Sequence, residues 1–293
     1  MQRIRRSILG QLIPGLSSLT KRGAAGWITL IGLVLVVSIV VITLMAPLIW
    51  PLDYMVKTGV VPQTSPPSLQ FPFGTNHLGQ DMLSRIFWGG SIMLQVAVLS
   101  VLICLIIGLP IGLLSSYAGG ALDRGTSLVM DSIYAFPGLV LAIAIAATLG
   151  RGVVNMAIAI AVVYVPSYFR VIRSQVLTIK ELTYTEAAKA AGARRRTILG
   201  RYILPNVVPS VVVVATVNFA DAILTAAGLT FIGLGVEKSI PDWGYDLTDG
   251  RALLASGVWW VITFPGIMIV LLALGFTLMG EGLSEILNPR LEQ

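Results

Sequence analysis

Long apolar runs alternate with short polar segments along most of the chain. Six of these runs contain no Lys or Arg, and as helices they are long enough to cross a hydrocarbon core of ~30 Å. They cover residues 27–50, 91–117, 126–149, 153–169, 207–235 and 258–282. The first run lacks a small-residue cleavage site, so we interpret it as an uncleaved anchor. The pattern predicts an all-α integral membrane protein with six transmembrane helices.

Lys and Arg are unevenly distributed between the connecting segments. If the helices alternate in direction, fifteen of the twenty fall on the side that holds both termini. Because cytoplasmic segments are enriched in Lys and Arg, both termini are predicted to be cytoplasmic. The predicted order is a cytoplasmic N-terminal segment (1–26), a first transmembrane helix (27–50), an extracytoplasmic loop (51–90), a five-helix core (91–282) with a cytoplasmic loop (170–206), and a cytoplasmic tail (283–293).

Two connecting segments are long enough to hold structure of their own. The outer one begins with a proline-rich stretch and ends in the polar residues 74–85, which we predict to form a surface helix. The inner one, 170–206, carries eight basic and two acidic residues. Charge alone favours a loop that is attracted to anionic lipid headgroups.

The inner segment also contains a helix signal. Thr183 and Glu186 have the spacing of a capping box, which predicts a helix start. Gly192 is placed to end that helix, and a second helix is predicted at 193–203, ended by Pro205. An Ala-rich helix of about eight residues is marginal by itself in water. The inference is a protruding helix that needs a partner.

Composition excludes several function classes. Hydrophobic residues make up 56% of the chain and charged residues only 12%, against roughly 25% charged in soluble domains. Cys104 and His77 are the only residues of their types, which excludes an intrachain disulfide and a thiolate metal site and leaves little for nucleophilic catalysis. A single His without clustered partners is more often simply polar than a metal ligand.

Three polar residues inside the predicted spans are candidates for a translocation pathway. Asp221 is near the middle of the fifth span, where a carboxylate costs about 2.5–3.5 kcal/mol, so it should face a cavity, a partner or water. A structural hydrogen bond to a neighbouring helix explains it equally well. Asn218 is three residues earlier on the same helix face. Asp131 is five residues into the third span, where a structural role near the interface is favoured.

These features, taken together, resemble the permease subunits of binding-protein-dependent ABC importers. Glu186-Ala-Ala, Gly192 and Ile203-Leu204-Pro205-Asn206 look like that family's EAA loop. Within the family, the chain is similar to the dipeptide/oligopeptide/nickel permease group. The supporting stretches are Phe73-Gly-Thr-Asn-His-Leu-Gly-Gln-Asp-Met-Leu-Ser-Arg85, Asp131 with Phe136-Pro-Gly138, Leu229-Thr-Phe-Ile-Gly-Leu-Gly235, Pro241-Asp-Trp-Gly244, Phe264-Pro-Gly266 and Asn288-Pro-Arg290.

The resemblance implies a fold, a location and a set of partners. It implies a type I ABC importer transmembrane domain in a bacterial or archaeal cytoplasmic (inner) membrane. The expected partners are a second homologous permease subunit, two cytoplasmic ATPase subunits, an extracytoplasmic substrate-binding protein and membrane lipid, with no nucleic acid. The chain contains no G-x-x-x-x-G-K-[ST], so ATP and Mg are expected on the ATPase subunits and no cofactor, metal or catalytic residue on this chain.

The resemblance also implies which residues contact the ATPases and what is transported. The coupling residues would be Thr183, Glu186, Ala187, Ala188, Ala191, Gly192, Leu204 and Pro205. Di- or oligopeptides are the expected substrates, with nickel complexes, glutathione or another small solute as alternatives. The chain departs from the family pattern at Gln80, Ser91, Ala226, Glu281 and Asn288, and an outward-facing basic contact at position 80 is therefore expected to be missing.

Two other classes compete with this interpretation. A stand-alone ion-coupled carrier would bind its coupling ion at Asp131 and Asp221, but it would leave the basic inner helix pair unexplained. An intramembrane enzyme is disfavoured because no G-x-S-x-G or H-E-x-x-H motif is present.

Overall fold

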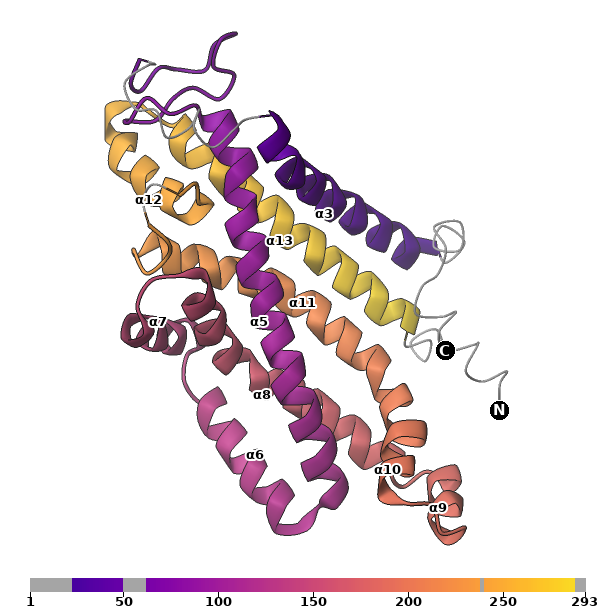
Figure 1. The fold of residues 1–293 in the computed structure, drawn as a ribbon. Coiled ribbons are helices and arrows are strands. Elements are labelled where there is room, and N and C mark those ends of the chain that lie inside the picture. Colours follow the sequence, from indigo (N-terminus) through magenta and orange to yellow (C-terminus); the bar gives the residue numbers. More distant parts are fainter. Residues whose placement is uncertain (1–22, 50–61, 238–239, 288–293) are drawn as a thin grey trace.

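The computed structural model describes residues 23–49, 62–237 and 240–287, whose regular structure is helical (Figure 1). The single β-type pairing in these residues is an isolated bridge between Thr75 and Asp81. The helices are α3 (Gly23–Ile49), α5 (Met82–Ala118), α6 (Gly120–Tyr134), α7 (Gly138–Leu149), α8 (Val153–Ile179), α9 (Thr183–Ala190), α10 (Arg195–Ile198), the π-helix η2 (Leu199–Ile203), α11 (Leu204–Phe231), α12 (Trp243–Leu253), the 3-10 helix η3 (Leu254–Ser256) and α13 (Trp260–Leu287).

The described residues contain five helices that are long and apolar enough to cross a membrane, in agreement with the predicted all-α membrane fold. They are α3, α5, α8, α13 and a continuous helix over Arg195–Phe231 that combines α10, η2 and α11. The predicted third span differs, because α6 and α7 form a broken pair bent by 90°. The break falls at residues 135–137, named the elbow below. Pro137 causes it, since proline has no N–H and disfavours helical geometry at the residue before it.

Close backbone contacts hold the long helices together. A Cβ atom on Gly32 of α3 would lie 2.5 Å from the backbone oxygen of Gly275 in α13. A Cβ on Gly108 or Gly112 of α5 would similarly meet Tyr168 or Ile172 of α8 at 2.9 and 2.8 Å. Small residues at these positions let the helix axes approach, which is the main source of attraction between helices in lipid.

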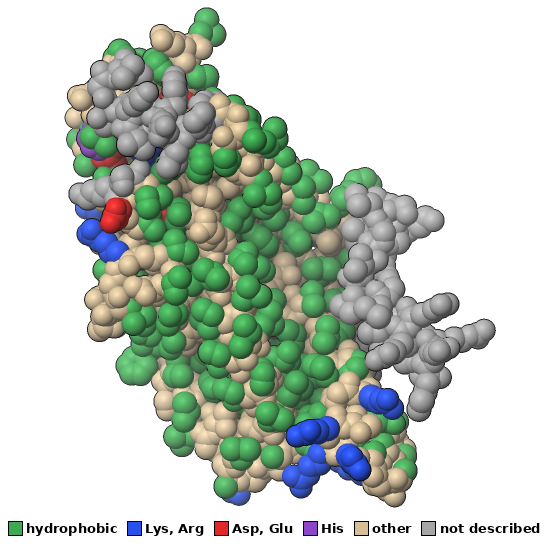
Figure 2. Space-filling model, in the orientation of Figure 1, with side chains coloured by type: hydrophobic (Ala, Val, Ile, Leu, Met, Phe, Trp, Pro, Cys, Tyr) green, Lys and Arg blue, Asp and Glu red, His purple; other side chains and the backbone are tan. Residues whose placement is uncertain are grey.

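α5 runs through the middle of the molecule and connects two hydrophobic clusters. One cluster lies among α3, α5, α7, α8, α11 and α13. The other lies among α5, α6, α8 and the α10–α11 segment. The α12 helix and residues 62–81 cover one end of the bundle, and α9 projects from the other (Figure 1). Lys and Arg side chains gather near α9 and α10 (Figure 2).

The surface helix predicted at residues 74–85 is wrong. Residues 74–81 form tight turns in which Gly74 and Gly79 both have φ of +72°. The Asn76 side chain accepts hydrogen bonds from the N–H groups of Leu78 and Gln80, which stabilises the turn instead of a helix. The helix begins only at Met82, where Asp81 caps its first turn, and it continues directly into the second span.

Candidate functional site

The short helix α9 begins at Thr183, but its start differs from the predicted capping box. Leu182 occupies the N-cap position and no side chain caps the helix, so Thr183 is already its first residue. The hydroxyl group of Thr185 anchors the helix instead: the side chain is fully buried, and the hydroxyl donates to the Ile179 carbonyl at 2.9 Å. This bond ties α9 to the end of α8. The sequence pattern pointed to Thr183, whereas Thr185, two residues later, is the threonine that anchors the helix.

The predicted end of α9 at Gly192 is confirmed. Gly192 has φ of +76°, and its N–H bonds to the Lys189 carbonyl. The N–H of Ala193 bonds to the Ala188 carbonyl, which completes a Schellman motif. A left-handed residue is required at this point, and glycine supplies it without strain.

The faces of α9 have different environments. Ala188 is buried against the chain itself, so it does not contribute to a free surface. Thr183, Glu186, Ala187 and Ala191 are exposed. Tyr184 and Lys189 are exposed as well. The outward side of α9 therefore combines small alanines with one aromatic ring, one basic group and one acidic group, Glu186.

The connection from α9 to α11 also differs from prediction. Pro205 does not end a helix, because Arg195–Phe231 is continuous. The five residues before α11 form a π turn in which the Leu204 N–H bonds to the Leu199 carbonyl. The wider turn changes the hydrogen-bond register just before Pro205, so the missing N–H of that proline interrupts no regular ladder. Leu204 and Pro205 are half-buried at this junction.

The predicted second inner helix buries apolar side chains against the bundle. Ile198 and Ile203 are buried at 1% and 0% exposure in the cluster shared with α5 and α8. Tyr202 stacks on Tyr184 of α9 with ring centroids 6.3 Å apart. α9, α10 and the start of α11 therefore form one packed unit.

The structure places the candidate pathway residues in two separate groups. Asn218 and Asp221 lie on α11 and approach each other at 3.5 Å, and Asp221 is half-buried. Asp131, on α6, instead pairs with Arg170 of α8 at 2.8 Å. Among the described residues, no hydrogen bond or ion pair joins Asp131 to Asp221, and no group of three or more His, Cys, Asp or Glu could hold a metal ion.

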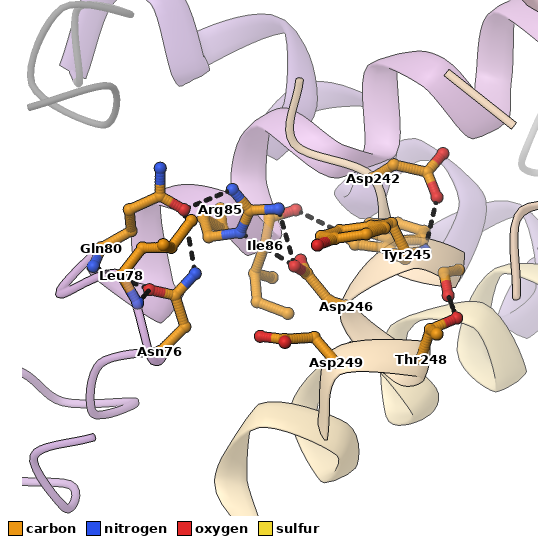
Figure 3. Close-up of polar contacts among 12 residues, drawn as sticks. Asn76, Leu78, Gln80, Arg85, Ile86, Asp242, Tyr245, Asp246, Thr248 and Asp249 are labelled. Carbon is orange, nitrogen blue, oxygen red and sulfur yellow. Dashed lines mark hydrogen bonds and ion pairs between the residues drawn. The ribbon is translucent and has the colours of Figure 1, made fainter. Parts of the chain in front are cut away.

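A buried polar network at the opposite end was not predicted. Arg85, 1% exposed, contacts Oδ1 of Asp246 in α12 through Nε at 2.9 Å and Nη2 at 2.7 Å (Figure 3). Its Nη1 donates to the Gln80 side-chain oxygen at 2.8 Å, and that oxygen also accepts from Asn76 at 2.9 Å. The sequence contained two hints: Arg85 stands alone near the start of the second span, and the acidic residues Asp242 and Asp246 precede the last span.

Tryptophans and a His pair complete the link between residues 62–81, α5 and α12. Trp243 donates to the Ile86 carbonyl at 2.8 Å, and Trp260 donates to the Thr75 carbonyl at 3.0 Å. His77 lies 2.7 Å from Asp249. His77 therefore acts as a polar link to α12, in line with the simply polar role that was favoured over a metal-ligand role.

Burial shifts the acids of this network. The pKa of Asp242 is raised to about 6, chiefly by burial, against the opposing effect of its hydrogen bond from the Tyr245 N–H. Burial also raises the pKa of Asp246, and the charge of Arg85 opposes that shift. The network therefore depends on Arg85 for its charge balance.

The departures from the family pattern have mixed consequences. Gln80 is buried and accepts a hydrogen bond from Arg85. Position 80 was expected to face outward, but it faces into the molecule. Ser91 bonds to the Trp88 carbonyl, Ala226 is fully buried in the core, and Glu281 is exposed. Asn288 lies outside the described residues.

Comparison with known proteins now identifies the family. The family described as "Binding-protein-dependent transport system inner membrane component" matches residues 108–293. The chain belongs to this family. It is therefore a multi-pass permease subunit of a binding-protein-dependent ABC importer in the inner membrane, not an enzyme, and its family implies ATPase and binding-protein partners.

Three relatives show how far this permease resembles named proteins. A dipeptide transport system permease protein of Alkalihalophilus pseudofirmus is 39% identical over 265 residues, which is 90% of this chain and 86% of the relative. A di/tripeptide transport system permease protein of Pseudomonas aeruginosa is 38% identical over 276 residues, or 92% and 89%. A glutathione transport system permease protein of Pectobacterium atrosepticum is 40% identical over 226 residues, or 77% and 75%.

Proposed function

We propose that this permease imports di- or oligopeptides, forms its pathway with a second homologous permease subunit, and receives the motion of two cytoplasmic ATPase subunits through α9. Similarity to dipeptide and di/tripeptide permeases extends over about nine-tenths of the chain, which supports a peptide substrate. The glutathione permease covers less of the chain, and glutathione is itself a tripeptide. Nickel complexes and other small solutes are the alternative substrates.

The observation that carries the coupling proposal is the anchoring of α9. The helix projects beyond the bundle (Figure 1), yet both of its ends are fixed. Thr185 bonds it to the end of α8, and the Schellman motif at Gly192 leads it into α10. Because α10 continues into α11 without interruption, a displacement of α9 moves α8 and α11 as rigid elements.

Each part of α9 has a distinct role in this proposal. Glu186 and Ala187 form the surface that an ATPase groove covers, with Thr183 and Ala191 at its edges. Ala188 packs inward and Gly192 fixes the turn, so these two shape the helix instead of touching the partner. Leu204 and Pro205 lie at the junction that passes the motion to α11. ATP and Mg would be held by the ATPase subunits, since this chain has no phosphate-binding loop.

The pathway proposal rests on the polar pair of α11. Asn218 and Asp221 lie on the helix that α9 would move, about halfway along it. The Asn218 side-chain oxygen is buried without a partner among the described residues. A peptide carries an ammonium group and amide N–H groups, which match a carboxylate and an amide oxygen. The pair would therefore contact the passing peptide.

The test is ATP-driven uptake of a labelled dipeptide into proteoliposomes that contain the chain, its partner permease, the ATPases and the binding protein. We expect uptake that unlabelled dipeptides compete with and that Asp221→Asn reduces. Leu224→Asn, a change at an exposed apolar position of the same helix, is the matched control. Uptake by the isolated chain without ATPases would contradict the proposal and favour the ion-coupled carrier.

A further inference from the structure

Helix α6 is attached to the bundle by few apolar contacts. All of its residues are described, and Met130 is the one buried apolar side chain among them. Other large apolar side chains of α6, such as Leu122, Leu128 and Val129, are more than half exposed. Because apolar packing is what usually holds a helix in place, α6 needs contacts of another kind.

Ion pairs with α8 supply those contacts. Arg173 binds Asp123 through two parallel hydrogen bonds, from Nε to Oδ1 and from Nη2 to Oδ2, each 2.8 Å long. The Asp123 side chain is only 10% exposed, so water competes little with this bidentate pair. Further along α6, Arg170 contacts Asp131 at 2.8 Å and lies 3.9 Å above the ring of Tyr134. That second pair is exposed and is therefore the weaker attachment.

Both ends of α6 have the geometry of a hinge. At its start, Gly119 and Gly120 have φ of +69° and +61°, a left-handed backbone that glycine adopts without strain. At its other end, the elbow bends the chain by 90° and contains Pro137, which has no N–H. Residues at the ends of helices are the ones that absorb the dihedral changes of a hinge motion. α6 can therefore change its angle to α5 and α7 while the ion pairs keep it on α8.

α8 is in turn joined to the helix that we propose receives the ATPase motion. The Thr185 hydroxyl bonds α9 to Ile179, the last residue of α8. Arg173 is six residues before Ile179, about 9 Å along the helix axis. The connection between α5 and α6 lies at the same end of the bundle as α9 (Figure 1), and Lys180 donates there to the Ser116 carbonyl of α5 at 3.5 Å. The Arg173 pair is thus close to the point where α8 would be displaced.

We infer that Arg173 and Asp123 are positioning residues for transport: their ion pair makes α6 move with α8 when the ATPases displace α9. This inference rests on the proposed function, which supplies the displacement of α9. Arg170 and Asp131 form the second attachment, so Asp131 positions a helix and is separate from the pair on α11 that contacts substrate.

The first test removes the charge of Asp123 at unchanged size. Asp123→Asn is reconstituted with the second permease, the ATPases and the binding protein, and both dipeptide uptake and ATP hydrolysis are measured. We expect hydrolysis to remain stimulated by loaded binding protein, whereas uptake per ATP falls about fivefold, because changes between two coupled sites weaken their coupling by about this much. Arg124→Gln is the matched control, since Arg124 is the exposed neighbour and forms no ion pair among the described residues.

The second test replaces the ion pair by a covalent link. In a Cys104→Ala background, Asp123→Cys and Arg173→Cys together remove the pair, and a short bis-methanethiosulfonate reagent joins the two thiols. We expect uptake per ATP to be low before linking, to recover in the linked protein and to fall again when dithiothreitol cleaves the link.

Three results would overturn the inference. Full uptake per ATP by Asp123→Asn, or an equal loss in Arg124→Gln, would show that the ion pair does not position α6. A linked protein that hydrolyses ATP without uptake would show that α6 must leave α8 during transport. Absence of ATP-driven dipeptide uptake in the unaltered complex would instead count against the proposed function, so the two failures are distinguishable.

Discussion

The buried pair of Arg85 and Asp246 makes a prediction whose size follows from its surroundings. Both side chains are 1% exposed, and Arg85 makes two contacts to Asp246 and one hydrogen bond to Gln80. Arg85→Met would leave the Asp246 carboxylate buried without its counter-charge. Loss of one partner of such a pair costs about 3–5 kcal/mol, so we expect the free energy of unfolding to fall by about 4 kcal/mol.

The double variant Arg85→Met, Asp246→Leu separates the cost of a stranded charge from the value of the pair. Replacing both partners by apolar groups removes the uncompensated charge, so the double variant should be more stable than Arg85→Met alone. Arg251→Met is the control, since Arg251 is exposed and lies 5.8 Å from the Phe231 ring. Its loss should cost below about 1 kcal/mol.

The measurement is unfolding by dodecyl sulfate in mixed micelles, followed by the loss of helical circular dichroism. A change of less than about 1 kcal/mol for Arg85→Met would refute the reasoning, because the site would then be hydrated or Asp246 neutral. A double variant less stable than Arg85→Met would refute it as well, since direct pairing would then outweigh the cost of burial.

Three further predictions concern backbone and proton positions. Gly32→Ala should separate α3 from α13, seen as loss of complex assembly in membranes, whereas Gly125→Ala, with no atom within 4 Å of its new Cβ, should have no effect. Gly192→Ala should cost about 1 kcal/mol through strain at its positive φ and speed hydrogen exchange in α9; equal exchange in Gly192→Ala and Gly200→Ala would contradict this. Asp242 has a folded pKa of about 6, above the unfolded value of about 3.9, so its contribution to stability is present below about pH 4 and lost as pH rises through 6, by up to about 3 kcal/mol. Asp242→Asn keeps the capping oxygen, so wild type should lose stability relative to it as pH rises from about 4 to 6. Parallel profiles over that range would show that Asp242 does not titrate there.

Hydrophobic runs predicted the spans well because a helix that crosses lipid must satisfy its backbone hydrogen bonds internally and carry mostly apolar side chains. They could not predict the elbow, since Thr126 to Leu149 is apolar on both sides of Pro137 and proline often only kinks a helix. The same ambiguity produced the opposite error at Pro205, where a π turn absorbs the missing N–H.

The candidate sites divide along similar lines. The end of α9 at Gly192 was predictable because its cause is local. Its start near Thr183 was predictable too, but its capping was not. No side chain caps the helix, and the threonine that holds it is Thr185, whose bond to the Ile179 carbonyl depends on tertiary packing. The pairs of Arg85 with Asp246 and of Arg170 with Asp131 join residues far apart in sequence, and no local pattern contains that information.

The most direct test of the account is ATP hydrolysis by the reconstituted complex, stimulated by substrate-loaded binding protein. Ala187→Trp would enlarge the exposed side of α9 without disturbing its buried side. Ala121→Trp places the same side chain at another exposed position, in the first turn of α6. We predict that stimulation is lost in Ala187→Trp and retained in Ala121→Trp, with equal membrane insertion of both. Normal stimulation in Ala187→Trp would contradict coupling through α9.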